Sequence, residues 1–142
     1  MHCPWLDLEH RHPDITVARR HIAPARAAAV PALGVIVLDS GLNFAASRCA
    51  LAHQVAHIDL CHTATLHPYF GKRQEAEATR LSDTRLLPID ALAPVLSWAL
   101  SIEEVATELQ VTADVVRRRL RRLTGSEKEM IHQRIESIEH SA

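Results

Sequence analysis

Aromatic side chains are scarce in this sequence of 142 residues, where Phe, Trp and Tyr together make up 4%. The core must therefore be built mainly from Leu, Val, Ile and Ala, which the hydrophobic fraction of 47% supplies. A chain of this length suffices for one compact domain with a modest core. We expect a single α+β domain over residues 1–142.

Long hydrophobic runs are missing too. No run approaches the ~20 apolar residues that span a bilayer, and the first residues, MHCPWLDLEHRHPD, lack the apolar core of a secretion signal. We therefore expect a cytoplasmic protein. The three cysteines, Cys3, Cys49 and Cys61, are odd in number and irregularly spaced, which favours free thiols over a disulfide framework. The net charge of −1 predicts no partner.

Two short strands and several helices are expected along the chain. β-Branched residues predict strands over DITVAR, residues 14–19, and GVIVLD, residues 34–39. Leu51, Val55 and Ile58 recur at spacings of four and three, which predicts a helix over about 45–62 with one buried face. The other expected elements are a helical or irregular start over 1–13, a short helix in the Ala-rich stretch between Pro24 and Pro31, a loop over 63–72, a helix over 73–86, and a short helix over 88–100 that is broken or restarted near Pro94.

The last third predicts a helix pair over residues 100–124, similar to a helix-turn-helix. Ser101 and Glu104 have the spacing of a capping box, which satisfies free amides of the first turn. A tight turn follows, and Thr112 is placed to cap the second helix. The turn has Gln110 where a helix-turn-helix customarily has glycine.

A pair of histidines in LAHQVAH, residues 51–57, indicates a metal site. His53 and His57 are four residues apart on the expected helix, so their side chains project side by side and can reach one zinc ion. By itself this spacing more often marks two hydrogen-bonded histidines on a helix face. A third ligand would come from the next helix, where Glu77 is the preferred candidate and Asp83 and Glu75 are the alternatives.

Cys61 also follows His57 at a spacing of four. Three ligands on consecutive turns of one straight helix would spread over about 12 Å, too far to converge on one ion. We therefore exclude Cys61 as a ligand.

Three ordered motifs resemble the ImmA/IrrE-type zinc metallopeptidases. RCALAHQVAHIDLCH, residues 48–62, is similar to the zinc helix of that family, with its L-A-H-E-x-x-H pattern and a further histidine. EATRLSDTRLLP, residues 77–88, is similar to its second signature, with Ser82 where alanine is usual. IEEVATELQVTADVVRRRLRRL, residues 102–123, is similar to its helix-turn-helix-like segment. The resemblance extends over residues 13–124.

This resemblance implies a small zincin-like metallopeptidase fold, with a short β-sheet before the zinc helix and a helical segment after it. It implies Zn²⁺ held by His53, His57 and Glu77. It also implies a regulatory protease of phage or mobile-element type, whose substrate is typically a helix-turn-helix repressor cleaved once to release transcription.

Gln54 occupies the position of the catalytic glutamate in that pattern. A glutamine amide keeps the size and the hydrogen bonding of glutamate but has no basic site near neutral pH. Loss of a general base lowers the rate by ~10²–10⁴, so we expect a zinc-loaded protein that is inactive or crippled. A natural pseudo-protease and an engineered Glu→Gln change both account for Gln54.

Three further side chains are candidates for supporting roles. His62 and His67 follow the zinc helix within reach of the expected site, and Tyr69 could donate a hydrogen bond to a tetrahedral oxyanion. Packing within the loop or support of a metal ligand is the simpler interpretation for each of them.

Five arginines gather on the second helix of the pair: Arg117, Arg118, Arg119, Arg121 and Arg122. They could contact DNA as a recognition helix does, bind an acidic protein surface, or solvate the outer face of a helix held to the core by Val116, Leu120 and Leu123. We favour the solvated face. The alternative function, of a different class, is a non-catalytic module that binds a repressor or DNA.

Overall fold

The computed structural model describes residues 1–63 and 65–141. Helices dominate it, and residues 16–39 form one small sheet, so the predicted α+β class is confirmed. The elements in chain order are α1 (Pro4–Arg11), β1 (Thr16–Arg20), β2 (Ala27–Val30), the 3-10 turn η1 (Pro31–Leu33), β3 (Val35–Asp39), α2 (Phe44–Asp59), α3 (Pro68–Leu86), α4 (Ile89–Leu96), α5 (Ile102–Leu109), α6 (Ala113–Arg121) and α7 (Gly125–Ser141).

The sheet has the strand order β1-β3-β2, with β1 parallel and β2 antiparallel to β3. The hairpin between β2 and β3 requires a glycine. Gly34 has φ of +61°, and a Cβ there would lie 2.9 Å from the carbonyl oxygen of Asp14. Because β2 pairs only with β3 in this sheet, its outer edge is free of strand pairing.

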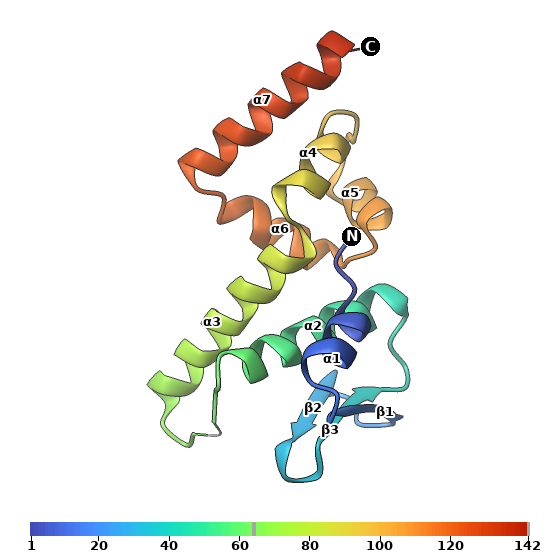
Figure 1. The fold of residues 1–142 in the computed structure, drawn as a ribbon, viewed down its shortest axis with the longest axis vertical. Helices are drawn as coiled ribbons and strands as arrows, with labels where there is room; N and C mark the ends of the chain where they lie inside the picture. Colours follow the sequence, from blue (N-terminus) through green and yellow to red (C-terminus); the bar gives the residue numbers. More distant parts are fainter. Residues whose placement is uncertain (64, 142) are drawn as a thin grey trace.

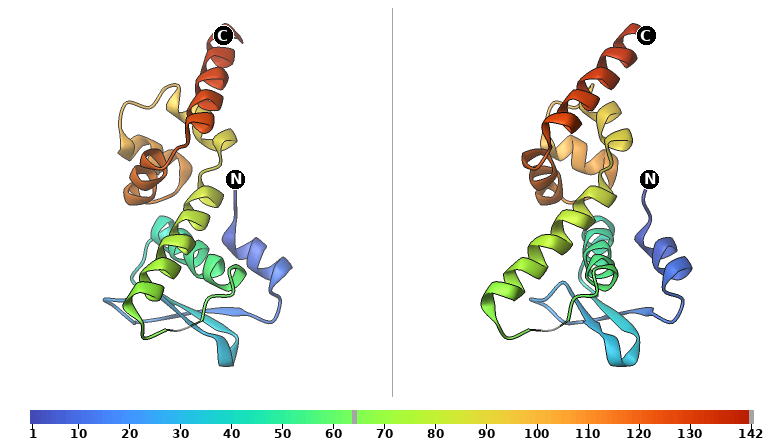
Figure 2. Two further views of the ribbon diagram at one scale, coloured as in Figure 1. Left: turned by 90° about the vertical axis from the view of Figure 1, so that its left-hand side faces the viewer. Right: turned by 60° about the vertical axis from the view of Figure 1, so that its left-hand side comes forward.

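Helix α2 lies on the sheet, between α1 and α3 (Figure 2). Its sheet-facing side contributes Leu51 and Val55 to a small core with Leu8, Ile36 and Leu38. This helix begins where the Asn43 side chain accepts a hydrogen bond from the amide of Ala46.

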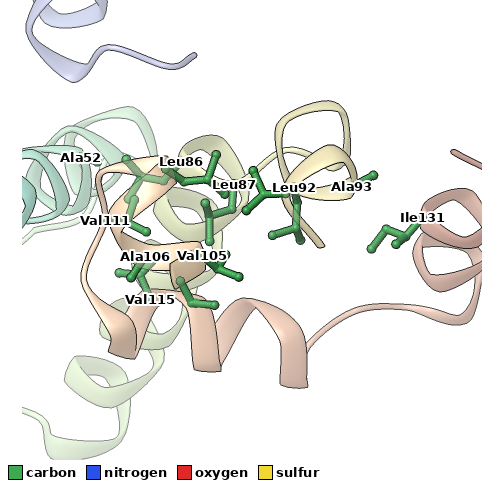
Figure 3. Close-up of a cluster of buried hydrophobic side chains, with 13 residues drawn as sticks. Ala52, Leu86, Leu87, Leu92, Ala93, Val105, Ala106, Val111, Val115 and Ile131 are labelled. Carbon is green, nitrogen blue, oxygen red and sulfur yellow. The ribbon is translucent and has the colours of Figure 1, made fainter. Parts of the chain in front are cut away.

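A second, larger core lies between the C-terminal end of α3 and the helices that follow it (Figures 1 and 3). Leu86, Leu87 and Leu92 lie at its centre and are each 2% exposed or less. Helices α5 and α6 cover one side of it, and Ile131 of α7 closes another. Helix α3 reaches from the sheet-bearing part to this larger core. It therefore holds the sheet-bearing part in place relative to the C-terminal helices.

Two predicted elements are corrected. Residues 27–30 form the edge strand β2, not a helix, because pairing with β3 satisfies the backbone of this short Ala run. Helix α3 begins at Pro68 rather than near residue 73, so much of the expected loop is helical. Proline at the first helical position lacks an amide that would be unpaired there anyway, so Pro68 starts this helix.

Pro94 was expected to break its helix, but it lies within the continuous helix α4. This helix has eight residues, so a proline near its end removes only one backbone hydrogen bond. Helix α7 was not predicted. It begins with a capping box in which Thr124 Oγ1 accepts from the amide of Glu127 at 3.1 Å and Glu127 Oε1 accepts from the amide of Thr124 at 3.2 Å.

The expected helix pair is confirmed, with two differences in detail. Ser101 Oγ accepts from the amide of Glu104 at 3.2 Å, as predicted, but the Glu104 carboxylate accepts from the amide of Leu100. Thr112 occupies the N-cap of α6 without a side-chain capping bond. Gln110 adopts the left-handed conformation at φ of 56°, so the turn forms without glycine. Buried Arg48 donates to the carbonyl oxygens of Leu109 and Gln110 and thereby stabilises this turn.

Asp59, the last residue of α2, links the first three helices. Its carboxylate accepts hydrogen bonds from Arg11 at 2.7 Å and from Arg85 at 2.5 Å, and His12 Nε2 lies 2.7 Å away. Burial opposes ionisation of Asp59, but these hydrogen bonds outweigh it, so its pKa lies well below the usual range.

We expect Asp59→Asn to lower the free energy of unfolding by about 1–3 kcal/mol at pH 7, because it removes a partly buried charged acceptor. Because the folded-state pKa of Asp59 is depressed, its contribution is present above the unfolded-state pKa of ~3.9 and is lost as the pH falls below it. Urea unfolding of parent and variant should therefore differ less and less below pH 4. Asp114→Asn, at an exposed ion pair with Arg117, should change stability by less than about 0.5 kcal/mol. Equal stability of parent and Asp59→Asn at pH 7 would contradict this role.

A candidate metal centre and its cleft

Two histidines of α2 and one glutamate of α3 bring three ligand atoms together. His53 Nε2 and His57 Nε2 lie 3.1 Å apart. The Glu75 carboxylate spans the pair, with Oε2 at 3.0 Å from His53 Nε2 and Oε1 at 2.8 Å from His57 Nε2. Among the described residues, this is the one group of three His, Cys, Asp or Glu side chains that meets the geometry of a metal site.

The dimensions of this triangle suit zinc. Ligands at ~2.0–2.1 Å from a tetrahedral ion lie about 3.3 Å from one another. The two Nε2 atoms are 3.1 Å apart, and each lies 2.8 or 3.0 Å from a different oxygen of the Glu75 carboxylate, so small rotamer adjustments would admit the ion. Two imidazoles and one carboxylate are a donor set that zinc accepts, and the remaining position would be open.

Helical periodicity explains why Glu75 reaches the histidines. Ala78 and Ser82 are buried on the face of α3 that meets α2. Glu75 lies three residues before Ala78 and seven before Ser82, so it belongs to the same face. Glu77 lies two residues further along, about 200° around the axis from Glu75.

The carboxylate at the histidine pair is thus Glu75, which the sequence favours less than Glu77. Glu77 Oε2 lies 3.0 Å from His62 Nε2, and Glu77 Oε1 accepts from Arg73 Nε at 3.0 Å. Those hydrogen bonds, from His62 above all, hold the pKa of Glu77 below its usual range. The third candidate, Asp83, is 2% exposed and accepts two hydrogen bonds from Arg118.

His57 has partners on both sides of its ring. Nε2 faces Glu75 and His53, while Nδ1 lies 2.9 Å from His62 Nδ1. Burial and the neighbouring His53 lower the pKa of His57. A low pKa favours the neutral imidazole, which is the form that binds a metal.

Gln54 lines the same cleft as His53 and Glu75, and the cleft is also lined by Ala25 and by Ala27, the first residue of β2. The cleft has a volume of about 390 Å³ and is also lined by Thr79, Ser82 and Arg118. The side chain at the position of the expected general base is therefore next to the candidate metal centre.

Of the other predicted positions, Ser82 lines the cleft, whereas His67 and Tyr69 do not. Ser82, which replaces alanine in the motif, is 2% exposed and donates to the carbonyl oxygen of Thr79 at 3.2 Å, so its hydroxyl is accommodated. His67 and Tyr69 lie at the exposed start of α3, where both rings contact Phe70. Neither is among the described residues that line the cleft.

Three of the five arginines of the α6 segment bind carboxylates within the chain. Arg118 binds Asp83, and Arg117 binds Glu103 and Asp114. Arg119 is 4% exposed, donates to the carbonyl oxygen of Leu87 at 2.9 Å and pairs with Glu127. Arg121 and Arg122 lie on the exposed surface.

Taken together, a small sheet, a helix with two histidines one turn apart, and a carboxylate from the next helix define a zincin-like metallopeptidase fold. A family model, described as the IrrE N-terminal-like domain of Peptidase_M78, matches residues 9–121. The chain belongs to this family, as its motifs predict.

A solved structure of a Mycobacterium tuberculosis transcriptional regulator has a similar fold, with a TM-score of 0.63 and 19% sequence identity. The match covers 80% of this chain but 38% of the regulator, so the chain corresponds to a minor part of that protein's length. Comparison with the curated proteins finds no match. In the described part of the chain, no helix combines the length and the apolar character needed to cross a membrane.

We expect Arg119→Ala to lower the free energy of unfolding by about 3 kcal/mol, because it leaves Glu127 and a buried carbonyl group without their partner. Arg122→Ala, which removes an exposed arginine from the same segment, should change stability by less than about 0.5 kcal/mol. Thermal and urea unfolding of the two variants measure the difference. Equal effects would show that the arginines of this segment act as one solvated surface.

Proposed function

We propose that this protein is a metallopeptidase-type domain that binds Zn²⁺ through His53, His57 and Glu75 and is catalytically crippled by Gln54. The observation that supports this proposal is the grouping of His53, His57 and Glu75, of which His53 and Glu75 line the same cleft as Gln54. It assigns the third ligand to Glu75 rather than Glu77, because the Glu75 carboxylate lies within 3.0 Å of both imidazoles.

A zinc ion, when bound, supplies Lewis acidity and makes water a stronger nucleophile. The remaining roles would belong to side chains of the protein. His53, His57 and Glu75 hold and orient the ion. Gln54 can hydrogen-bond to a water molecule or to a peptide group, but its amide cannot take a proton at neutral pH. The cleft therefore retains binding and orientation while the proton transfer needed for hydrolysis is lost.

We propose a protein substrate or partner bound in an extended conformation. The start of β2 borders the cleft, and the outer edge of this strand is free to pair with an added strand in the described sheet. The family resemblance makes a cytoplasmic helix-turn-helix repressor the proposed partner. The similarity to a transcriptional regulator is in keeping with a regulatory role.

Gln54 itself supports a second candidate, a non-catalytic module that retains the cleft for binding. A repressor is a better partner than DNA for such a module. Arg117, Arg118 and Arg119 already bind carboxylates of the chain, which leaves the α6 segment with two exposed arginines for phosphate contacts.

Zinc binding to the purified protein tests the ligand assignment. We expect His53→Ala and Glu75→Ala to weaken binding by more than the ~10–100-fold that loss of an outer partner causes. Glu77→Ala should stay within that range. Isothermal titration with Zn²⁺, checked by metal analysis, measures the affinities. A larger loss for Glu77→Ala than for Glu75→Ala would restore Glu77 as the ligand, and no zinc binding by the parent would refute the metal centre.

Restoring the base tests the enzyme proposal. Gln54→Glu should raise the hydrolysis of labelled casein by ~10²–10⁴ over the parent in the presence of Zn²⁺. The double variant Gln54→Glu/His53→Ala is the control, because it restores the carboxylate but lacks one proposed ligand. If Gln54→Glu binds zinc yet gives no hydrolysis of casein or of a co-expressed helix-turn-helix repressor, the binding module is the better description.

A further inference from the structure

The cleft extends from the candidate metal centre to an ion pair between α3 and α6, which lie side by side (Figure 1). His53 and Glu75 line one part of it, and Asp83 and Arg118 line another. Asp83 follows Glu75 by eight residues on α3, which corresponds to about 12 Å along the helix axis. An extended peptide rises about 3.3 Å per residue. A segment that runs along the cleft from the metal centre would therefore bring a side chain about three or four residues away to the ion pair.

Short side chains leave room between the metal centre and the ion pair. On α2 before His53, and on α3 between Glu75 and Asp83, the residues that line the cleft are Ala46, Cys49, Ala50, Thr79 and Ser82. Each lies three, four or seven residues from the histidine or glutamate of the metal centre on its own helix, so it belongs to the same helix face. The two helices therefore form opposite walls without a bulky residue that would block a bound segment.

Asp83 holds the guanidinium of Arg118 in a fixed orientation. Arg118 Nε donates to Asp83 Oδ2 at 2.8 Å, and Arg118 Nη2 donates to Asp83 Oδ1 at 3.1 Å. The side chain of Asp83 is 3% exposed, whereas that of Arg118 is 32% exposed. Two parallel hydrogen bonds fix the plane of a guanidinium, and this group has five N–H donors in all. The pair with Asp83 uses two of them, so Arg118 can donate further hydrogen bonds to a ligand in the cleft.

The charges along the cleft favour an acidic ligand group. Apart from Glu75 at the candidate metal centre, the residues lining the cleft that carry a full charge at neutral pH are Arg26, Asp83 and Arg118. Asp83 offsets one arginine, which leaves one positive charge in excess. A carboxylate matches a guanidinium in both charge and geometry. A lysine or arginine side chain of a partner would be opposed by like charge.

We propose that this part of the cleft is a subsite for an aspartate or glutamate side chain of the bound partner, with Arg118 as the residue that contacts the carboxylate. Arg26 adds positive charge to the same subsite. This inference rests on the proposed function, because the metal centre is taken as the point at which the extended partner is anchored. Arg118 then has two roles: it ties α6 to α3 through Asp83, and it selects the side chain that the cleft accepts.

Peptides anchored to the metal test the subsite in the zinc-loaded protein. The probes are short alanine peptides with a zinc-binding hydroxamate at one end or the other, and with one glutamate, glutamine or lysine placed at each remaining position in turn. We expect glutamate to bind ~5–30-fold more tightly than glutamine at one position, about three or four residues from the hydroxamate. Lysine at that position should bind more weakly than glutamine. Isothermal titration measures the affinities.

A paired substitution tests the assignment to Arg118. Asp83→Asn/Arg118→Gln removes both charges together, so no buried charge is left without its partner. This variant should lose the preference for glutamate and keep the zinc affinity of the parent. The matched control is Asp114→Asn/Arg117→Gln, which removes an exposed ion pair of the same helix and should keep the preference. Arg26→Gln should lower it in part.

A second measurement uses the metal-free protein and does not depend on zinc. NMR spectra follow the Nε–H signal of Arg118 and the backbone amides of Cys49 and Val115, which line the cleft, during titration with a blocked alanine peptide that contains one glutamate. The same peptide with glutamine is the reference. We expect the glutamate peptide to shift these signals more. Circular dichroism identifies a paired variant that fails to fold, and Arg118→Lys, which keeps the charge but not the planar fork, then replaces it and should reduce the preference.

The outcomes separate this inference from the proposed function. Equal affinities for glutamate and glutamine peptides at every position, in a parent that binds zinc, would overturn the subsite and leave the metal centre intact. A preference for glutamate that persists in the folded paired variant would overturn the role of Arg118. If the parent does not bind zinc, the metal centre is refuted, and the titration of the metal-free protein decides the subsite by itself. Equal shifts with both peptides would then overturn it.

Discussion

The close approach of α2 and α3 is the constraint on which the rest of the molecule depends. The two helices meet through small buried side chains: Ala52 and Ala56 on α2, and Ala78 and Ser82 on α3, each 2% exposed or less. Small residues allow two helix axes to lie near one another, so that short side chains can meet across them. The imidazoles of α2 reach the Glu75 carboxylate because of this packing, and both helices line the cleft together with residues of β2 and α6.

Side chains contact the candidate metal centre both toward the cleft and away from it. Toward the cleft, Glu75 and His53 complete the triangle of ligand atoms, and Gln54 lies beside them. Away from the cleft, His62 Nδ1 lies 2.9 Å from His57 Nδ1, and Glu77 lies 3.0 Å from the other ring nitrogen of His62. In the proposed function, Gln54 would lack the base without disturbing either side, because glutamine has nearly the size of glutamate.

The arginine-rich helix has a structural explanation. Arg118 crosses to Asp83 on α3, and Arg119 reaches Glu127 and the end of α3, so α6 is tied to the same helix that carries Glu75. Arg48 links α2 to the helix pair in a similar way, because it donates to the carbonyl groups at the end of α5. These bonds attach the helix-turn-helix-like pair to the peptidase-like part, which a freely presented DNA-reading helix would not need.

Sequence pattern by itself determined the family motifs, the α+β class, the zinc-type helix and the capped helix pair, because each depends on residues close together in the chain. It also contained a signal for α7 in the capping box at Thr124 and Glu127. Tertiary structure alone decided that residues 27–30 form a strand, since a short Ala run takes its conformation from the strand beside it. Tertiary structure alone also decided which glutamate faces the histidines. Glu75 and Glu77 are chemically identical and two residues apart, and only the face of α3 that packs on α2 distinguishes them.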